Sequence, residues 1–112
     1  MTELAQKKCA PCEGGVAPLT RDAAQELLAK LQDGWKLTAD TRSIRRELAF
    51  KDFYRTVSFV NAVAHVANIE DHHPDLEVGY NYCRITFTTH AIKGLSENDF
   101  ICAAKIDSIA RV

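Results

Sequence analysis

A helical repeat of apolar side chains occupies the middle of the chain and ends shortly before a proline. The repeat has the spacing of an amphipathic helix, and Asp52 stands where such a helix would begin. Pro74 prevents the helix from continuing, because proline disfavours helical backbone at the residue before it. The helix therefore needs another apolar surface against which its apolar stripe can pack. The stripe is expected to comprise Phe53, Val57, Val60, Ala64 and Ala67, widened by Phe59, Val63 and Val66.

Short segments of alternating polarity flank this helix and are expected to supply that surface. Before the helix, a strand with Trp35 and Leu37 is followed by a turn and a second strand that carries Ile44, Leu48 and Phe50. After the helix, two further strands lie on either side of a turn at residues 79–81. Each pair is predicted to form an antiparallel hairpin. The opposite face of these strands is expected to meet water and carries Lys36, Arg45, Glu47, Arg84 and Thr86.

Capping signals predict two more helices. Thr20 can cap a helix that stops at Asp33-Gly34, and Ser96 with Asp99 resembles a capping box at the start of a final helix. The resulting order of elements is α-β-β-α-β-β-α. This order predicts an α+β fold, in which three helices pack on one face of a four-stranded antiparallel sheet. The sheet would have open edges, so we expect the chain to associate with itself.

The composition fits one small domain. The chain has 112 residues, of which 46% are hydrophobic and 26% are charged, which is enough for one core that folds without metal or disulfide help. We expect residues 19–112 to form this domain and residues 1–18 to be a loosely packed N-terminal tail. With a formal net charge of −1, the chain offers no overall field that would draw nucleic acid.

We expect a cytoplasmic protein that does not enter a membrane. Apolar runs long enough for a membrane helix or a secretory signal are lacking. In a reducing compartment the cysteines are expected to be thiols; they are Cys9, Cys12, Cys83 and Cys102. Cys9 and Cys12 form a lone Cys-x-x-Cys, which is interpreted as an incidental pair in the tail rather than as a redox or zinc site.

Three of the four histidines, His72, His73 and His90, lie within a short segment. They can act as helix-end and strand-end residues that carry no chemistry, or converge as an acid and a base. A third interpretation is a metal site with nearby carboxylates. It is disfavoured because no helical His-x-x-x-His or paired Cys-x-x-Cys accompanies the histidines. Asp99 is interpreted as a capping residue and Trp35 as a core residue, with the border of a pocket as the alternative.

Several motifs together resemble the pterin-4a-carbinolamine dehydratases. They are "DHHPD", "THAIKGLSENDF", a preceding "GW" and "FKDFYRTVSFVNAVA", and the similarity extends from about Thr20 to Ile109. The resemblance implies four antiparallel strands with helices on one side, assembled into homodimers or homotetramers. It also implies dehydration of 4a-hydroxytetrahydropterin, the product of aromatic amino acid hydroxylases, to quinonoid dihydropterin. That reaction needs an acid and a base but no metal, nucleotide or flavin, so no cofactor is expected.

The resemblance assigns roles to individual residues. His72, His73 and His90 match the catalytic histidines, of which His72 and His90 are the acid/base pair. His73, Asp71 and Trp35 are expected to contact the pterin, while Asp99 and Asn68 support the site. Asn68 departs from several relatives, which carry an acidic residue there. As an alternative function, the chain would be an oligomeric partner or assembly protein that keeps the pterin pocket without dehydratase activity, as in animal members that serve as dimerisation cofactors of a transcription factor.

Overall fold

Two hairpins join side by side to form one antiparallel sheet. The protein is represented by a computed structural model that describes residues 3–10 and 16–110. Its four strands stand in the order β1-β2-β4-β3, so the second strand of each hairpin lies in the centre. Every neighbouring pair is antiparallel. The strands are β1 (Lys36–Leu37), β2 (Ile44–Ala49), β3 (Asp75–Val78) and β4 (Tyr82–Phe87).

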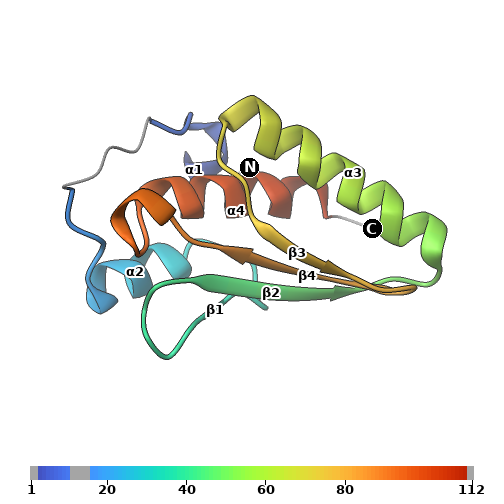
Figure 1. Cartoon of the computed structure of the whole chain (residues 1–112), viewed down its shortest axis with the longest axis horizontal. Helices are drawn as coiled ribbons and strands as arrows, with labels where there is room; N and C mark the ends of the chain where they lie inside the picture. Colours follow the sequence, from blue (N-terminus) through green and yellow to red (C-terminus); the bar gives the residue numbers. More distant parts are fainter. Residues whose placement is uncertain (1–2, 11–15, 111–112) are drawn as a thin grey trace.

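The helices cover one side of this sheet, with α3 and α4 lying along it (Figure 1). The described helices are α1 (Glu3–Gln6), α2 (Arg21–Leu28), α3 (Phe53–Glu70) and α4 (Glu97–Ile109), and a 3₁₀ turn, η1 (His90–Ile92), precedes α4. The predicted α+β order is therefore confirmed, with α1 as an addition at the N-terminal end. Thr20 caps α2 and Asp52 caps α3, each accepting a backbone N–H with its side-chain oxygen. The helix α2 ends at Leu28, before the predicted stop at Asp33-Gly34.

The core lies between the sheet and α4. Alternate residues of the central strands are buried toward the helices, whereas Arg45 and Glu47 on the other face are exposed. The helix α4 is buried over most of its surface, as expected for a helix enclosed by neighbours on several sides. Buried side chains on the sheet are Ile44, Leu48, Cys83, Ile85 and Phe87, and those on α4 include Phe100, Cys102 and Ile106.

The predicted stripe of α3 is wrong in its centre. The buried face consists of Thr56, Phe59, Val63 and Ala67. Of these, only Ala67 belongs to the predicted stripe, whereas Phe59 and Val63 were predicted as its widening. Phe53 is instead 52% exposed. Apolar residues occur on more than one side of α3, so periodicity alone could not choose the face that meets the sheet.

The described part of the N-terminal tail is better packed than the sequence predicts. Leu4 and Ala5 on α1 are 3% and 7% exposed, and α1 packs against α4. The Nζ of Lys105 on α4 donates a hydrogen bond to the carbonyl of Ala5 at 2.8 Å. A single helical turn contains too few residues to show a helical repeat of apolar side chains. For this reason α1 was not predicted from the sequence.

Candidate active site

The C-terminal end of α3 turns sharply and thereby releases the histidine pair from the helix. Asp71 adopts a left-handed conformation with φ 51° and ψ 44°, which aspartate tolerates better than most residues. The backbone N–H groups of Asp71 and His72 both donate to the carbonyl of Ala67. Pro74 then leads into β3, so the helix end directs the side chain of His72 toward α4.

His72 contacts a buried carboxylate at the start of α4. Its Nε2 lies 2.6 Å from Oδ1 of Asp99, and the side chains of the two residues are 11% and 0% exposed. An ionised carboxylate only accepts hydrogen bonds, so this contact places the imidazole proton on Nε2 and leaves Nδ1 as the nitrogen that can accept another proton. A carboxylate hydrogen-bonded to one ring nitrogen fixes the orientation of the imidazole.

Asp99 is itself held by two donors. Its Oδ2 accepts the hydroxyl of Thr89 at 2.8 Å and the backbone N–H of Ser96 at 3.0 Å. The second of these bonds belongs to the predicted capping box. Thr89 also lies 2.8 Å from the Ser96 hydroxyl, and because its one proton goes to Asp99, Ser96 donates in that contact. Both carboxylate oxygens of Asp99 are thus engaged, which fixes the oxygen that meets His72.

His73 and His90, the other two histidines of the predicted cluster, are exposed. His90 is exposed and opens η1 directly after Thr89, so it is one residue away from a donor to the Asp99 carboxylate. His73 is also exposed, and its Nε2 lies 3.1 Å from Oδ1 of Asn68. Asn68 is therefore a partner of His73 in this structure.

Phe87 connects His72 to the core. Its ring is stacked on the imidazole of His72, with centroids 6.0 Å apart and planes 6° from parallel. The ring centroid of Trp35 lies 6.1 Å from that of Phe87. Trp35 is 5% exposed, and its indole N–H donates to Oδ1 of Asp107 at 2.8 Å. The structure thus places Trp35 in the core, as one of the two interpretations predicted, and its contact with a substrate stays a prediction.

Two residues of this centre were missed by the sequence analysis, namely Thr89 and Phe87. Both continue the buried alternation of β4, because Cys83, Ile85, Phe87 and Thr89 fall on one parity. A hydroxyl on a buried parity needs a partner. The position of Thr89 in the sequence therefore indicated a buried hydroxyl with a hydrogen-bond partner, but it could not identify Asp99 as that partner.

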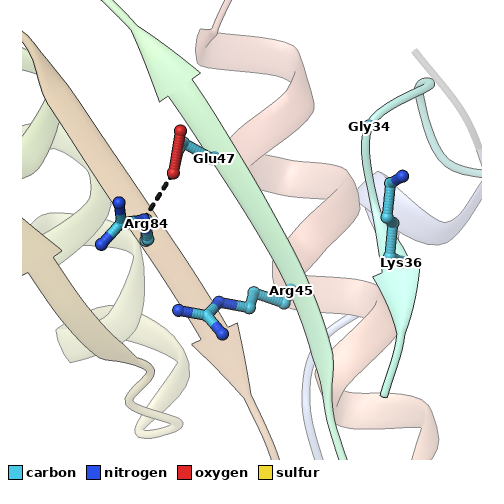
Figure 2. Close-up of a pocket in the computed structure, with 5 residues that line it drawn as sticks. All are labelled: Gly34, Lys36, Arg45, Glu47 and Arg84. Atoms are coloured by element: carbon cyan, nitrogen blue, oxygen red, sulfur yellow. Dashed lines mark hydrogen bonds and ion pairs between the residues drawn. The ribbon is translucent and has the colours of Figure 1, made fainter. Parts of the chain in front are cut away.

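The open face of the sheet carries a hollow, lined by charged side chains of β1, β2 and β4 (Figure 2). Arg84 donates to Glu47 at 2.5 Å, and Arg45 donates to Glu77 at 2.8 Å. These ion pairs confirm the predicted polar face. Its charges largely compensate one another, and the imidazole of His72 contacts Phe87 on the opposite face of the sheet. The lining residues are Gly34, Lys36, Arg45, Glu47 and Arg84.

Across residues 3–10 and 16–110, no three His, Cys, Asp or Glu side chains gather in a way that could hold a metal ion. The same residues contain no helix with the length and apolar character needed to cross a membrane. Cys12 of the Cys-x-x-Cys lies outside the described residues.

Comparison with known proteins identifies the family of this chain. The family described as pterin 4 alpha carbinolamine dehydratase matches residues 17–109. The chain belongs to this family. Relatives assigned by name to the pterin-4-alpha-carbinolamine dehydratases, which are hydro-lyases, include one from Nitrosomonas eutropha, 61% identical over 107 residues, covering 96% of this chain and 93% of the relative. Another, from Legionella pneumophila, is 56% identical over 108 residues and 96% of each chain.

Solved structures agree with the fold of the pterin carbinolamine dehydratase family. A protein from Brucella melitensis, described as a transcriptional coactivator/pterin dehydratase, superimposes with a TM-score of 0.79 at 35% identity and covers 84% of this chain and 99% of its own. A pterin dehydratase-like protein described as a RuBisCO assembly factor superimposes with a TM-score of 0.61 at 22% identity, over 70% and 92% of the two chains. At that identity the second likeness concerns the fold alone.

Proposed function

We propose that this protein dehydrates 4a-hydroxytetrahydropterin to quinonoid dihydropterin by histidine acid/base catalysis. Membership of the dehydratase family supports the reaction. The contact of His72 with the buried carboxylate of Asp99 supports the mechanism, because it is the feature expected of an imidazole that must keep a fixed orientation while it exchanges protons.

The chemistry needs two proton transfers at neighbouring positions of the substrate. One proton goes to the departing 4a-hydroxyl, which leaves as water, and another leaves the ring nitrogen N5. We assign these transfers to His72 and His90 as a pair, since imidazole exchanges protons readily near neutral pH. His72 would work through Nδ1, because its Nε2 is bonded to Asp99. His90, next to Thr89, would act from the exposed side of the same centre.

The remaining predicted residues would bind or position the pterin. His73 and Asp71 are exposed at the end of α3 beside His72, where they can meet a ligand from solvent. Asn68 would orient His73 through the contact with Nε2. Trp35 would help to position the site through Phe87, since Trp35 contacts Phe87 and Phe87 is stacked on His72.

The proposed reaction connects this protein to an aromatic amino acid hydroxylase. Such an enzyme releases the 4a-hydroxytetrahydropterin that the dehydratase would consume, and dehydration would return the pterin to its recycling route in the cytoplasm. Dehydration assays that couple this protein to a hydroxylase would test the link directly.

The decisive experiment measures dehydration of freshly generated 4a-hydroxytetrahydropterin by absorbance. His72→Ala and His90→Ala should each lower the rate by about 10²-fold or more, as for a lost general acid or base. His65→Ala is the matched control, because His65 is exposed on α3 and has no assigned role; its rate should equal that of the wild type. Wild-type rates in both site variants would reject the mechanism, and no dehydration by the wild type would reject the function.

A second candidate function is that of a partner or assembly protein with a pterin pocket. The description of the Brucella melitensis relative, which combines a coactivator and a dehydratase, supports it. A pulldown from the source cell, with the dehydration assay run in parallel, separates the two. A specific partner together with an inactive wild type would favour this second function.

We also propose that the protein forms homodimers or homotetramers, with the outer face of α3 as one contact. Tyr54 is 89% exposed and Phe53 is 52% exposed, and the ring of Phe53 is stacked on that of Tyr80, which is 66% exposed. A groove on this face is lined by Phe53, Tyr54, Val57, Ser58 and Asn61. Large exposed aromatic side chains of this kind are typical of contact surfaces.

A further inference from the structure

Two cysteines from opposite ends of the chain meet in the folded protein. Cys9 follows α1, Cys102 lies in α4, and their Sγ atoms are 3.5 Å apart. A disulfide joins its sulfurs at about 2.05 Å, so the two sulfurs need to approach by only about 1.5 Å. The sequence analysis considered Cys9 only together with Cys12, as an incidental pair, because a separation of 93 positions gives no hint of contact with Cys102.

The backbone around Cys9 is held in place by several contacts. The N–H of Cys9 donates to Oε1 of Glu70 at 2.8 Å. Ala10 and Asn98 exchange two hydrogen bonds, at 3.0 and 2.7 Å. Leu4 and Ala5 on α1 are buried just before this point. The approach of the two thiols is therefore built into the packing of residues 3–10 against α3 and α4.

The two sulfurs differ in access. Cys102 is fully buried, whereas Cys9 is partly exposed. The hydrogen bond to Cys9, together with burial, raises the pKa of Cys102 well above its ordinary range, so Cys102 keeps its proton. An oxidant from solvent would meet Cys9 first, and Cys102 would act as the second, resolving sulfur.

We propose that Cys9 and Cys102 form a dithiol site that a peroxide converts into an intramolecular disulfide. With hydrogen peroxide, the sulfur of Cys9 attacks one oxygen, the O–O bond breaks, and a sulfenic acid and water form. The sulfur of Cys102 then displaces the sulfenic oxygen, which takes up the Cys102 proton and leaves as a second water. Two thiols are oxidised and one peroxide is reduced.

The disulfide would fasten the N-terminal segment to the elements that carry the candidate active site. Glu70, which binds the Cys9 backbone, stands two positions before His72, and Asn98, which binds Ala10, directly precedes Asp99. The inference itself rests on the geometry of the thiols and does not depend on the proposed function. Failure of the dehydration assay would leave it unaffected.

Mass spectrometry of the full chain tests the linkage. The protein is treated with hydrogen peroxide, alkylated in denaturant and digested with trypsin without reduction, and Cys12→Ser is used so that the peptide of residues 9–21 contains one cysteine. We expect this peptide linked to the peptide of residues 94–105, with Cys83 fully alkylated. The inference is overturned if, after peroxide treatment of Cys12→Ser, Cys9 and Cys102 are both still free thiols and are alkylated. It is also overturned if Cys9 is oxidised to the sulfinic or sulfonic acid without forming the linkage. Formation of a Cys9–Cys12 linkage alone in the wild type would also overturn it.

Thermal unfolding gives an independent readout. Oxidised Cys12→Ser should unfold at a temperature about 5 °C or more above the reduced form, because the crosslink restricts the unfolded chain. Dithiothreitol should reverse this shift. Cys102→Ala in the same background is the control and should show no change on oxidation. Equal unfolding temperatures for a verified linked form and its reduced form would overturn the fastening of the segment.

Discussion

His72 is hydrogen-bonded at 2.6 Å to Asp99, a carboxylate with no exposed surface. The two residues come from the end of α3 and the start of α4, where a left-handed turn at Asp71 and a capping box at Ser96 bring them together. Asp99 thus closes the helix cap with Oδ2 and holds the imidazole with Oδ1. The residue that caps α4 and the residue that binds the His72 imidazole are here the same.

Replacing Asp99 by Asn should lower kcat for dehydration by roughly 10- to 100-fold. An amide that accepts from Thr89 and Ser96 with its oxygen presents its NH₂ group to His72, which then has to accept at Nε2 and carry its proton on Nδ1. Steady-state kinetics with circular dichroism would separate this effect from unfolding. Asp52→Asn is the matched control, since Asp52 caps the far end of α3, about 27 Å along an 18-residue helix. Equal rates for both variants would contradict the role of Asp99.

Removing the buried partner of Arg46 should be costly to the fold. Asp107 accepts from Arg46 at 2.5 Å and from the indole of Trp35 at 2.8 Å, and the side chains of the Arg46–Asp107 pair are 15% and 8% exposed. Asp107→Ala leaves a buried cation without its partner and should destabilise the protein by about 3–5 kcal/mol. Urea denaturation measures the change. The double variant Arg46→Met/Asp107→Leu should recover part of it, because it removes the unpaired cation but still leaves the indole N–H of Trp35 without its acceptor. No recovery at all would assign the loss to the donors that Asp107 accepts and not to the ion pair.

Shortening Leu4 on α1 should also destabilise the protein. The side chain is 3% exposed within the core cluster, so Leu4→Ala should cost about 2 kcal/mol or more. A loosely packed tail, as the sequence predicted, would show no change. Gln6→Ala, an exposed position on the same helical turn, serves as the control in the same thermal and urea unfolding experiments.

A charge on the outer face of α3 should weaken the proposed self-association. Tyr54 is 89% exposed, and Tyr54→Glu should shift the mass measured by light scattering toward the monomer without altering the circular dichroism spectrum. Gln25→Glu, on the exposed side of α2, introduces the same charge elsewhere and should leave the assembly unchanged. An oligomer that survives Tyr54→Glu would locate the contact at another surface, such as a sheet edge.

Local signals in the sequence were sufficient for the elements of the fold. Capping residues Thr20, Asp52 and Ser96, together with the alternation in each hairpin, depend on neighbours a few positions away. The caps and the alternation of β2 and β4 hold in the structure, whereas β3 departs from alternation at Val78, which is 43% exposed. The orientation of α3 about its axis did not follow from the sequence, because apolar residues lie on several of its faces. Burial of Phe59 rather than Phe53 depends on which face the sheet and α4 cover.

By itself, then, the sequence determined the α+β order and the candidate histidines, because hydrophobic period, caps and motifs are properties of neighbouring residues. Only the tertiary structure decided that Thr89 joins His72 at one carboxylate, that Trp35 donates to Asp107, and that Cys9 meets Cys102 rather than pairing along the chain. These contacts join residues that are 10, 72 and 93 positions apart. Contacts between residues so far apart in the sequence depend on how whole helices and strands pack together. A short stretch of sequence contains no information about that packing.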